Sequence, residues 1–64
     1  MNRISVDPKI WLGQPTVRGT RITVSVIIKM LAGGKTVQDV LEAYPELERE
    51  DIFQAMKYAA RLAG

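Results

Sequence analysis

Cysteine and histidine are absent from this sequence of 64 residues. The chain therefore lacks disulfides and the usual ligands of structural zinc, which small domains commonly add to a limited core. The commonest general base and the most reactive nucleophile of enzymes are missing for the same reason. We expect no metal, no cofactor, no small-molecule substrate and no enzymatic activity.

Long hydrophobic runs are absent as well. No apolar segment approaches the roughly 20 residues that a membrane-spanning helix needs, and the N-terminal residues do not form the hydrophobic stretch of a signal peptide. We therefore expect a cytoplasmic protein without membrane contact. A chain this short buries only about 60% of the surface that it exposes when unfolded. We expect residues 1–64 to form one domain that gains stability by association, most simply as a homodimer.

Charges of the two signs are unevenly distributed along the chain, although the net charge is only +2. Residues 1–35 hold six Lys or Arg against one Asp, a net +5, whereas residues 36–64 hold three Lys or Arg against six Asp or Glu, a net −3. A solvated surface would explain this pattern, and so would an N-terminal half that faces a polyanion. The charge pattern leaves both interpretations open.

The pattern of residues 1–23 predicts short strands and a turn. Residues 3–6, "RISV", alternate polar and apolar side chains and end before an Asp-Pro pair. Residues 16–17 and 21–24 could pair as a hairpin around Gly19, which can adopt the positive φ that such a turn needs. Because an isolated hairpin is marginally stable in water, we expect one strand to pair with another chain or to pack on the helices.

Residues 24–64 predict a three-helix bundle, because their apolar residues recur at helical spacing. Thr23 and Thr36 are placed as N-caps of the first two helices. The stretch "GGKT" (33–36) resembles the end of a phosphate-binding loop, but it lacks that loop's first glycine and preceding strand. A glycine C-cap followed by a threonine N-cap explains these four residues. The expected helices are residues 24–32, 36–44 and about 48–63.

Helical spacing also assigns the faces of the third helix. The positions expected to face the core are Ile52, Ala55, Met56, Ala59 and Leu62 or Ala63. The positions expected in the outer row are Glu50, Gln54, Lys57 and Arg61.

The first helix is apolar on most of its circumference, which implies burial on more than one side. Val26 and Met30 lie off its main apolar stripe. Trp11 and Leu12 precede it in a segment flanked by glycine and proline, and tryptophan is enriched among interface hot spots. These four residues are our candidates for dimer or partner contact.

The second and third helices, joined through "YPELE" (44–48), form a helix-turn-helix outline. In a DNA-binding version the third helix would enter the major groove with its N-terminal residues. Here that end carries an acidic cluster, which phosphates would repel. Contact with DNA would then use Gln54, Lys57 and Arg61, whereas a solvated helix face explains the same residues without DNA. The acidic cluster consists of Glu46, Glu48, Glu50 and Asp51.

The stretch "PTVRGTRITV" (15–24) places two arginines around a Gly-Thr pair. We expect Val17 and Ile22 to pack inward and Arg18 and Arg21 to project. Guanidinium groups suit bidentate phosphate contact, which makes both arginines candidates for DNA or anion contact. The alternative is a structural role, in which they cap carbonyls or pair with the acidic start of the third helix.

A series of short motifs resembles a known family. From Asp7 to Ala60 the sequence has Asp-Pro, Gly-x-Pro, Arg-Gly-Thr-Arg-Ile, a helix ending in glycine, Tyr-Pro and an alanine-rich helix. This order resembles the family called domain of unknown function 433, and residues 18–22 are its specific part. The sequence departs from the family pattern at Gln14, where lysine is usual, and at Glu48, where Thr or Ser usually caps the last helix.

The resemblance implies a fold and a function. Most members of that family resemble VapB-like antitoxins of type II toxin-antitoxin pairs, with a homeodomain-like trihelical fold, and are often encoded beside a PIN-like nuclease toxin. We therefore expect a mainly α, three-helix bundle with a short N-terminal strand or hairpin. The expected function is an antitoxin that binds such a toxin and its own promoter DNA. The alternative is a small dimeric interaction adaptor without DNA binding.

Overall fold

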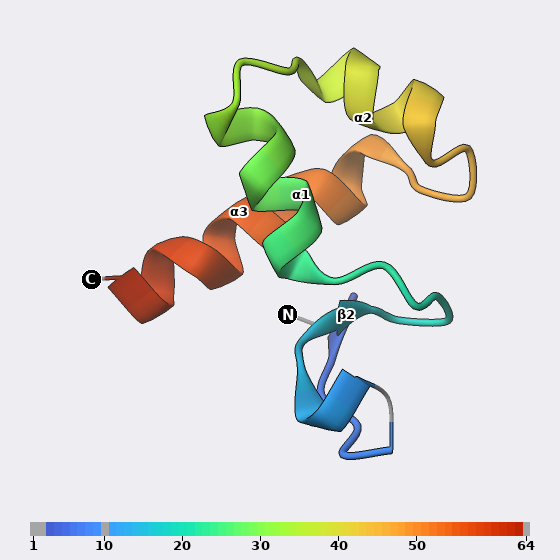
Figure 1. Cartoon of the computed structure of the whole chain (residues 1–64), viewed down its shortest axis with the longest axis vertical. Helices are drawn as coiled ribbons and strands as arrows, with labels where there is room; N and C mark the ends of the chain where they lie inside the picture. Colours follow the sequence, from blue (N-terminus) through green and yellow to red (C-terminus); the bar gives the residue numbers. More distant parts are fainter. Residues whose placement is uncertain (1–2, 10, 64) are drawn as a thin grey trace.

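The structure, a computed structural model, describes residues 3–9 and 11–63, apart from the side chain of Trp11. Figure 1 shows α1 crossing α3, with α2 and the N-terminal strands near opposite ends of α1. The predicted mainly α fold with three helices and an N-terminal hairpin is confirmed. In chain order the elements are β1 (Ile4–Ser5), a short 3-10 turn η1 (Trp11–Gly13), β2 (Thr16–Val17), α1 (Val24–Ala32), α2 (Val37–Ala43) and α3 (Arg49–Ala63).

The two strands pair with each other inside the chain. They are antiparallel, with Ile4 opposite Val17 and Ser5 opposite Thr16. The hairpin predicted around Gly19 is present only as a single bridge between Thr16 and Thr23. The main partner of β2 is thus the N-terminal strand β1, which in turn packs on α3. Packing on a helix supplies the support that a two-stranded hairpin lacks in water.

The predicted helix caps are confirmed by hydrogen bonds. The Thr23 hydroxyl accepts the Val26 N–H at 3.1 Å, which starts α1. Thr36 and Asp39 form a reciprocal capping box at the start of α2, in which each side chain accepts the other residue's backbone N–H. These hydrogen bonds, led by the one from the Thr36 backbone, lower the pKa of Asp39. Local polar residues therefore set where both helices begin.

One hydrophobic core joins the strands to all three helices. Ile27 in α1, Val40 in α2 and Ile52 in α3 have no exposed surface, so each helix contributes a fully buried side chain. The N-terminal residues Val17 and Ile22 are also buried, as predicted for the inward side of the turn. Among the residues that the structure describes, the buried apolar ones are Ile4, Val17, Ile22, Val24, Ile27, Val40, Leu47, Ile52 and Ala55.

The buried face of α3 differs from the predicted one. Ile52 and Ala55 are buried as expected, but Met56 is 42% exposed and Asp51 is buried. Gln54, expected in the outer row, is half-buried. These differences have one cause. Asp51 and Ala55, which are four residues apart, both belong to the buried face of α3. This face is therefore turned toward Gln54 and away from Met56.

The last turn of α3 is not covered by the rest of the fold. The sequence pattern predicts Leu62 or Ala63 as a core residue, yet Leu62 is 73% exposed and Ala63 is also exposed. The reason is length: α1 has nine residues and α3 has fifteen, so the shorter helix cannot cover the longer one to its end. In Figure 1 the C-terminal turns of α3 extend beyond α1.

Candidate functional site

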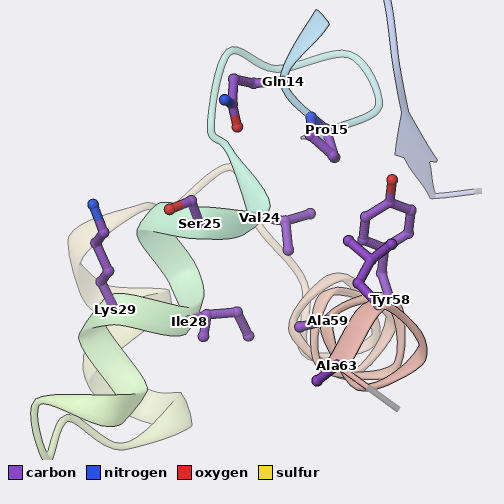
Figure 2. A pocket seen from close by; sticks show the side chains of 10 residues that line it. Gln14, Pro15, Val24, Ser25, Ile28, Lys29, Tyr58, Ala59 and Ala63 are labelled. Atoms are coloured by element: carbon purple, nitrogen blue, oxygen red, sulfur yellow. The ribbon is translucent and has the colours of Figure 1, made fainter.

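An open groove of about 550 Å³ lies between α1, the C-terminal half of α3 and the segment before β2. Figure 2 shows Ile28 of α1 pointing toward Ala59 and Ala63 of α3 and Val24 of α1 pointing toward Tyr58, with Pro15 at one end. The groove exists because α3 continues beyond the part that α1 covers. Its walls are formed by Gln14, Pro15, Val24, Ser25, Ile28, Lys29, Tyr58, Ala59, Leu62 and Ala63.

The chemistry of this groove is apolar with a cationic rim. Among the described residues, Lys29 is the only charged one that lines it, and Figure 2 shows the Lys29 side chain directed away from Ala59 and Ala63. Leu62, which is 73% exposed, supplies a large apolar side chain that nothing covers in the part of the chain that the structure describes. An apolar groove of this kind suits an amphipathic segment of another protein.

The segment from Val17 to Ile22 forms a tight turn. The Thr20 N–H donates to the Val17 carbonyl at 3.0 Å, and Gly19 has φ +81°, which fits the third position of a type II β-turn. The Thr20 hydroxyl accepts the Ile22 N–H at 3.0 Å and donates to the Val17 carbonyl at 2.8 Å. The turn thus has its own hydrogen bonds, and a residue with a Cβ at Gly19 would be strained.

Arg18 and Arg21 are both exposed on this turn, as predicted. Their neighbours Val17 and Ile22 anchor the turn in the core. The two cations are therefore presented on a rigid support at the surface, where an anionic ligand could reach them.

Arg3, which the sequence did not mark as a site residue, pairs with the acidic start of α3. One of its guanidinium nitrogens lies 2.8 Å from Glu48 Oε1 and 2.9 Å from Asp51 Oδ1. The hydrogen bond with Glu48, followed by that with Asp51, raises the pKa of Arg3 further above its ordinary value. The hairpin thus lies against the helix end that a DNA-reading third helix would expose. No local pattern could indicate this pair, because 48 residues separate Arg3 from Asp51.

The other predicted DNA contacts on α3 are only partly available. Lys57 and Arg61 are exposed, as predicted. Gln54 is half-buried; its Nε2 donates to Glu50 at 3.0 Å and its Oε1 is buried without a hydrogen bond among the described residues. Gln54 is therefore poorly placed to read a base edge.

The four predicted contact residues for a dimer or partner have different surroundings. Val26 is half-buried, and Met30 is half-buried against the core of its own chain. Leu12 is 99% exposed, the highest value among the large apolar side chains that the structure describes. The side chain of Trp11 lies outside the described residues. Leu12 thus retains the clearest capacity for contact with another molecule.

Leu12 also has an unusual backbone conformation, with φ +56° and ψ +35°. This left-handed conformation is unfavourable for leucine and is tolerated by asparagine. We expect Leu12→Asn to raise the free energy of unfolding by up to about 1 kcal/mol, because it relieves strain without removing a buried contact. Urea denaturation would measure this change. A loss of stability instead would show that the leucine side chain packs against the chain.

The described part of the chain holds no group of three or more Cys, His, Asp or Glu side chains placed to bind a metal ion. Within residues 3–9 and 11–63, no helix is long and apolar enough to cross a membrane.

Comparisons with known proteins place the chain in a family. It is 41% identical over 56 residues to an uncharacterised protein, y4eO, of Sinorhizobium fredii, a match that covers 88% of this chain but 25% of that protein. The crystal structure of a DUF433 member protein from Anabaena variabilis superimposes with a TM-score of 0.90 at 31% identity, over 95% of this chain and 60% of that one. The chain thus spans about a quarter of the Sinorhizobium protein and three fifths of the Anabaena chain. Residues 4–59 match the family described as "Protein of unknown function (DUF433)", and the chain belongs to this family.

Proposed function

We propose that the chain is an antitoxin of a type II toxin-antitoxin pair and that it binds a PIN-like nuclease toxin through the groove between α1 and α3. The proposal has no catalytic step and assigns no cofactor. The toxin class comes from the resemblance to VapB-like antitoxins, and we likewise propose a homeodomain-like relation for the three-helix arrangement. The observation that carries partner binding is the uncovered apolar groove, with Leu62 exposed at 73% beside it.

Several properties of the groove favour a protein as its occupant. Its walls combine two helices and an extended segment, so that a partner would contact a surface fixed by the core. Its apolar residues include Ile28, Pro15 and Tyr58, which offer both aliphatic and aromatic contact area. Its openness at the end of α3 suits a helix or strand of a larger protein better than a small enclosed ligand.

Co-expression tests this function directly. The proposed partner, a PIN-like nuclease, is expressed under an inducible promoter, with and without the chain, and growth is followed. We expect growth arrest by the nuclease alone and its relief by the chain. Arrest that continues despite soluble chain at equal abundance would contradict the antitoxin function.

Promoter binding is a second candidate function, favoured by the two arginines on the rigid turn. Arg18 and Arg21 are exposed, whereas the acidic start of α3 is held by Arg3 and would repel phosphates. We propose that phosphate contacts come mainly from this turn. A two-fold dimer would present the pair twice, to half-sites about one helical turn of DNA apart.

The Arg18→Ala and Arg21→Ala double variant is therefore expected to bind the native promoter more weakly than the wild type. We expect its salt slope to be shallower by roughly one unit for each phosphate that the variant no longer neutralises. The matched variant with Lys57→Ala and Arg61→Ala should have a smaller effect. Fluorescence anisotropy at several salt concentrations measures both, with circular dichroism as the folding control. A larger effect of the helix pair would make α3 the DNA-contacting element.

If the wild type shows no salt-dependent binding to the promoter, the alternative function applies. The chain would then act as a small interaction adaptor without DNA binding, and the groove would still be its contact surface.

A further inference from the structure

The outer face of α3 carries an apolar stripe that is separate from the groove. Phe53 and Met56 are 41% and 42% exposed, and Ala60 is exposed next to them. Their spacing of three and then four residues places all three on one side of the helix. The pattern matches the a and d positions of a coiled-coil seam. The buried residues Asp51 and Ala55 lie on the opposite side, toward the core.

Charge along one edge of this stripe changes sign from one end to the other. Glu50 lies beside the stripe in the first turn of α3, and Lys57 lies beside it seven residues later. Both are exposed, and neither takes part in an ion pair among the described residues. Seven residues are two helical turns, so the two side chains share one edge of the stripe but are about 10 Å apart along the axis. They cannot pair within one helix.

An antiparallel copy of the same helix would cover the apolar stripe and would pair the opposite charges of Glu50 and Lys57. When Phe53 of one copy lies over Met56 of the other, the two-fold axis repeats this contact in reverse. The same register brings Glu50 of each copy near Lys57 of the other, as at the e positions of an antiparallel coiled coil. Ala60, which is small, would allow the two helices to approach closely. A parallel arrangement would instead place like charges at the same level.

We propose that a second copy of this chain binds here, through antiparallel packing of α3 on α3. This surface differs from the Val26 and Met30 face that the sequence suggested for a dimer. It also leaves the groove free, because the groove is lined from α3 by Tyr58, Ala59, Leu62 and Ala63 and not by Phe53 or Met56. The proposal is therefore independent of the proposed toxin binding.

Charge reversal tests the register. Sedimentation equilibrium from micromolar to millimolar concentration, at low ionic strength, compares the wild type with Glu50→Lys, Lys57→Glu and the variant that carries both changes. Each single change replaces two attractive pairs by two repulsive ones, so we expect dimerisation to weaken about tenfold. The double change restores the opposite charges across the interface and should recover most of the affinity.

Circular dichroism controls for folding, and the double variant separates pairing from local effects. Glu50→Lys also removes the hydrogen bond from Gln54 and alters the first turn of α3, and the double variant retains both of these local changes. Recovery in the double variant thus supports intermolecular pairing. A wild type that is monomeric at millimolar concentration, or a dimer that all three variants leave unchanged, would overturn the proposal.

Discussion

Leu62→Glu is expected to weaken binding of the proposed nuclease partner by about thirtyfold or more, equivalent to about 2 kcal/mol. Leu62 is the large, mostly exposed apolar side chain beside the groove. Burying a carboxylate against an apolar partner surface, without a group to pair with it, costs more than removing the leucine side chain alone. Because the side chain is 73% exposed in the free chain, the substitution should change its stability by no more than about 0.5 kcal/mol.

Val6→Glu provides a matched control for this substitution. Val6 is an apolar residue that is 57% exposed and does not line the groove. Both variants add one negative charge, so a difference between their affinities reports on position and not on net charge. Isothermal titration calorimetry with the purified nuclease measures both. Equal affinities for the two variants would place the partner elsewhere on the surface.

Asp51→Ala is expected to lower the free energy of unfolding by about 2–3 kcal/mol, a large share of the stability of a small domain. Asp51 is only 7% exposed and makes two charged hydrogen bonds. Its Oδ1 accepts from Arg3 at 2.9 Å and its Oδ2 accepts the Glu48 N–H at 2.8 Å. The substitution therefore removes both a helix-capping interaction and one of the two ion pairs that join Arg3 to the start of α3.

Glu48→Ala is the control for the Asp51 substitution. The hydrogen bond with Glu48 is the larger cause of the raised pKa of Arg3, yet the Glu48 side chain is 72% exposed. Solvent screens such a pair, so we expect this variant to lose no more than about 0.5 kcal/mol. Urea denaturation of the two variants compares them. Equal losses would mean that the buried carboxylate has no special role at the start of α3.

Local features of the fold could be predicted from sequence because neighbouring residues determine them. Thr23 and Thr36 cap helices through bonds to residues three positions later, and Gly19 shapes a turn closed by Val17 and Thr20. These signals lie within a few residues of one another. The helix boundaries and the projection of the two arginines on the turn followed from them.

Features that depend on how elements meet could not be predicted in the same way. The pairing of β1 with β2 and the interaction of Arg3 with Asp51 join distant residues. The groove arises because a short α1 crosses a longer α3. Periodicity alone predicts that Leu62 or Ala63 faces the core. The exposure of Met56 likewise depends on which side of α3 faces α1. Sequence patterns identify an apolar face but not the length over which it is covered.

Methyl chemical-shift mapping tests the central claim most directly. The labelled chain is titrated with the proposed PIN-like nuclease partner, and the methyl signals of Ile28, Leu62, Val6 and Met56 are compared. Binding in the groove between α1 and α3 predicts the largest changes at Ile28 and Leu62, with little change at Val6. Largest changes at Val6 or Met56, with Ile28 and Leu62 unaffected, would contradict it.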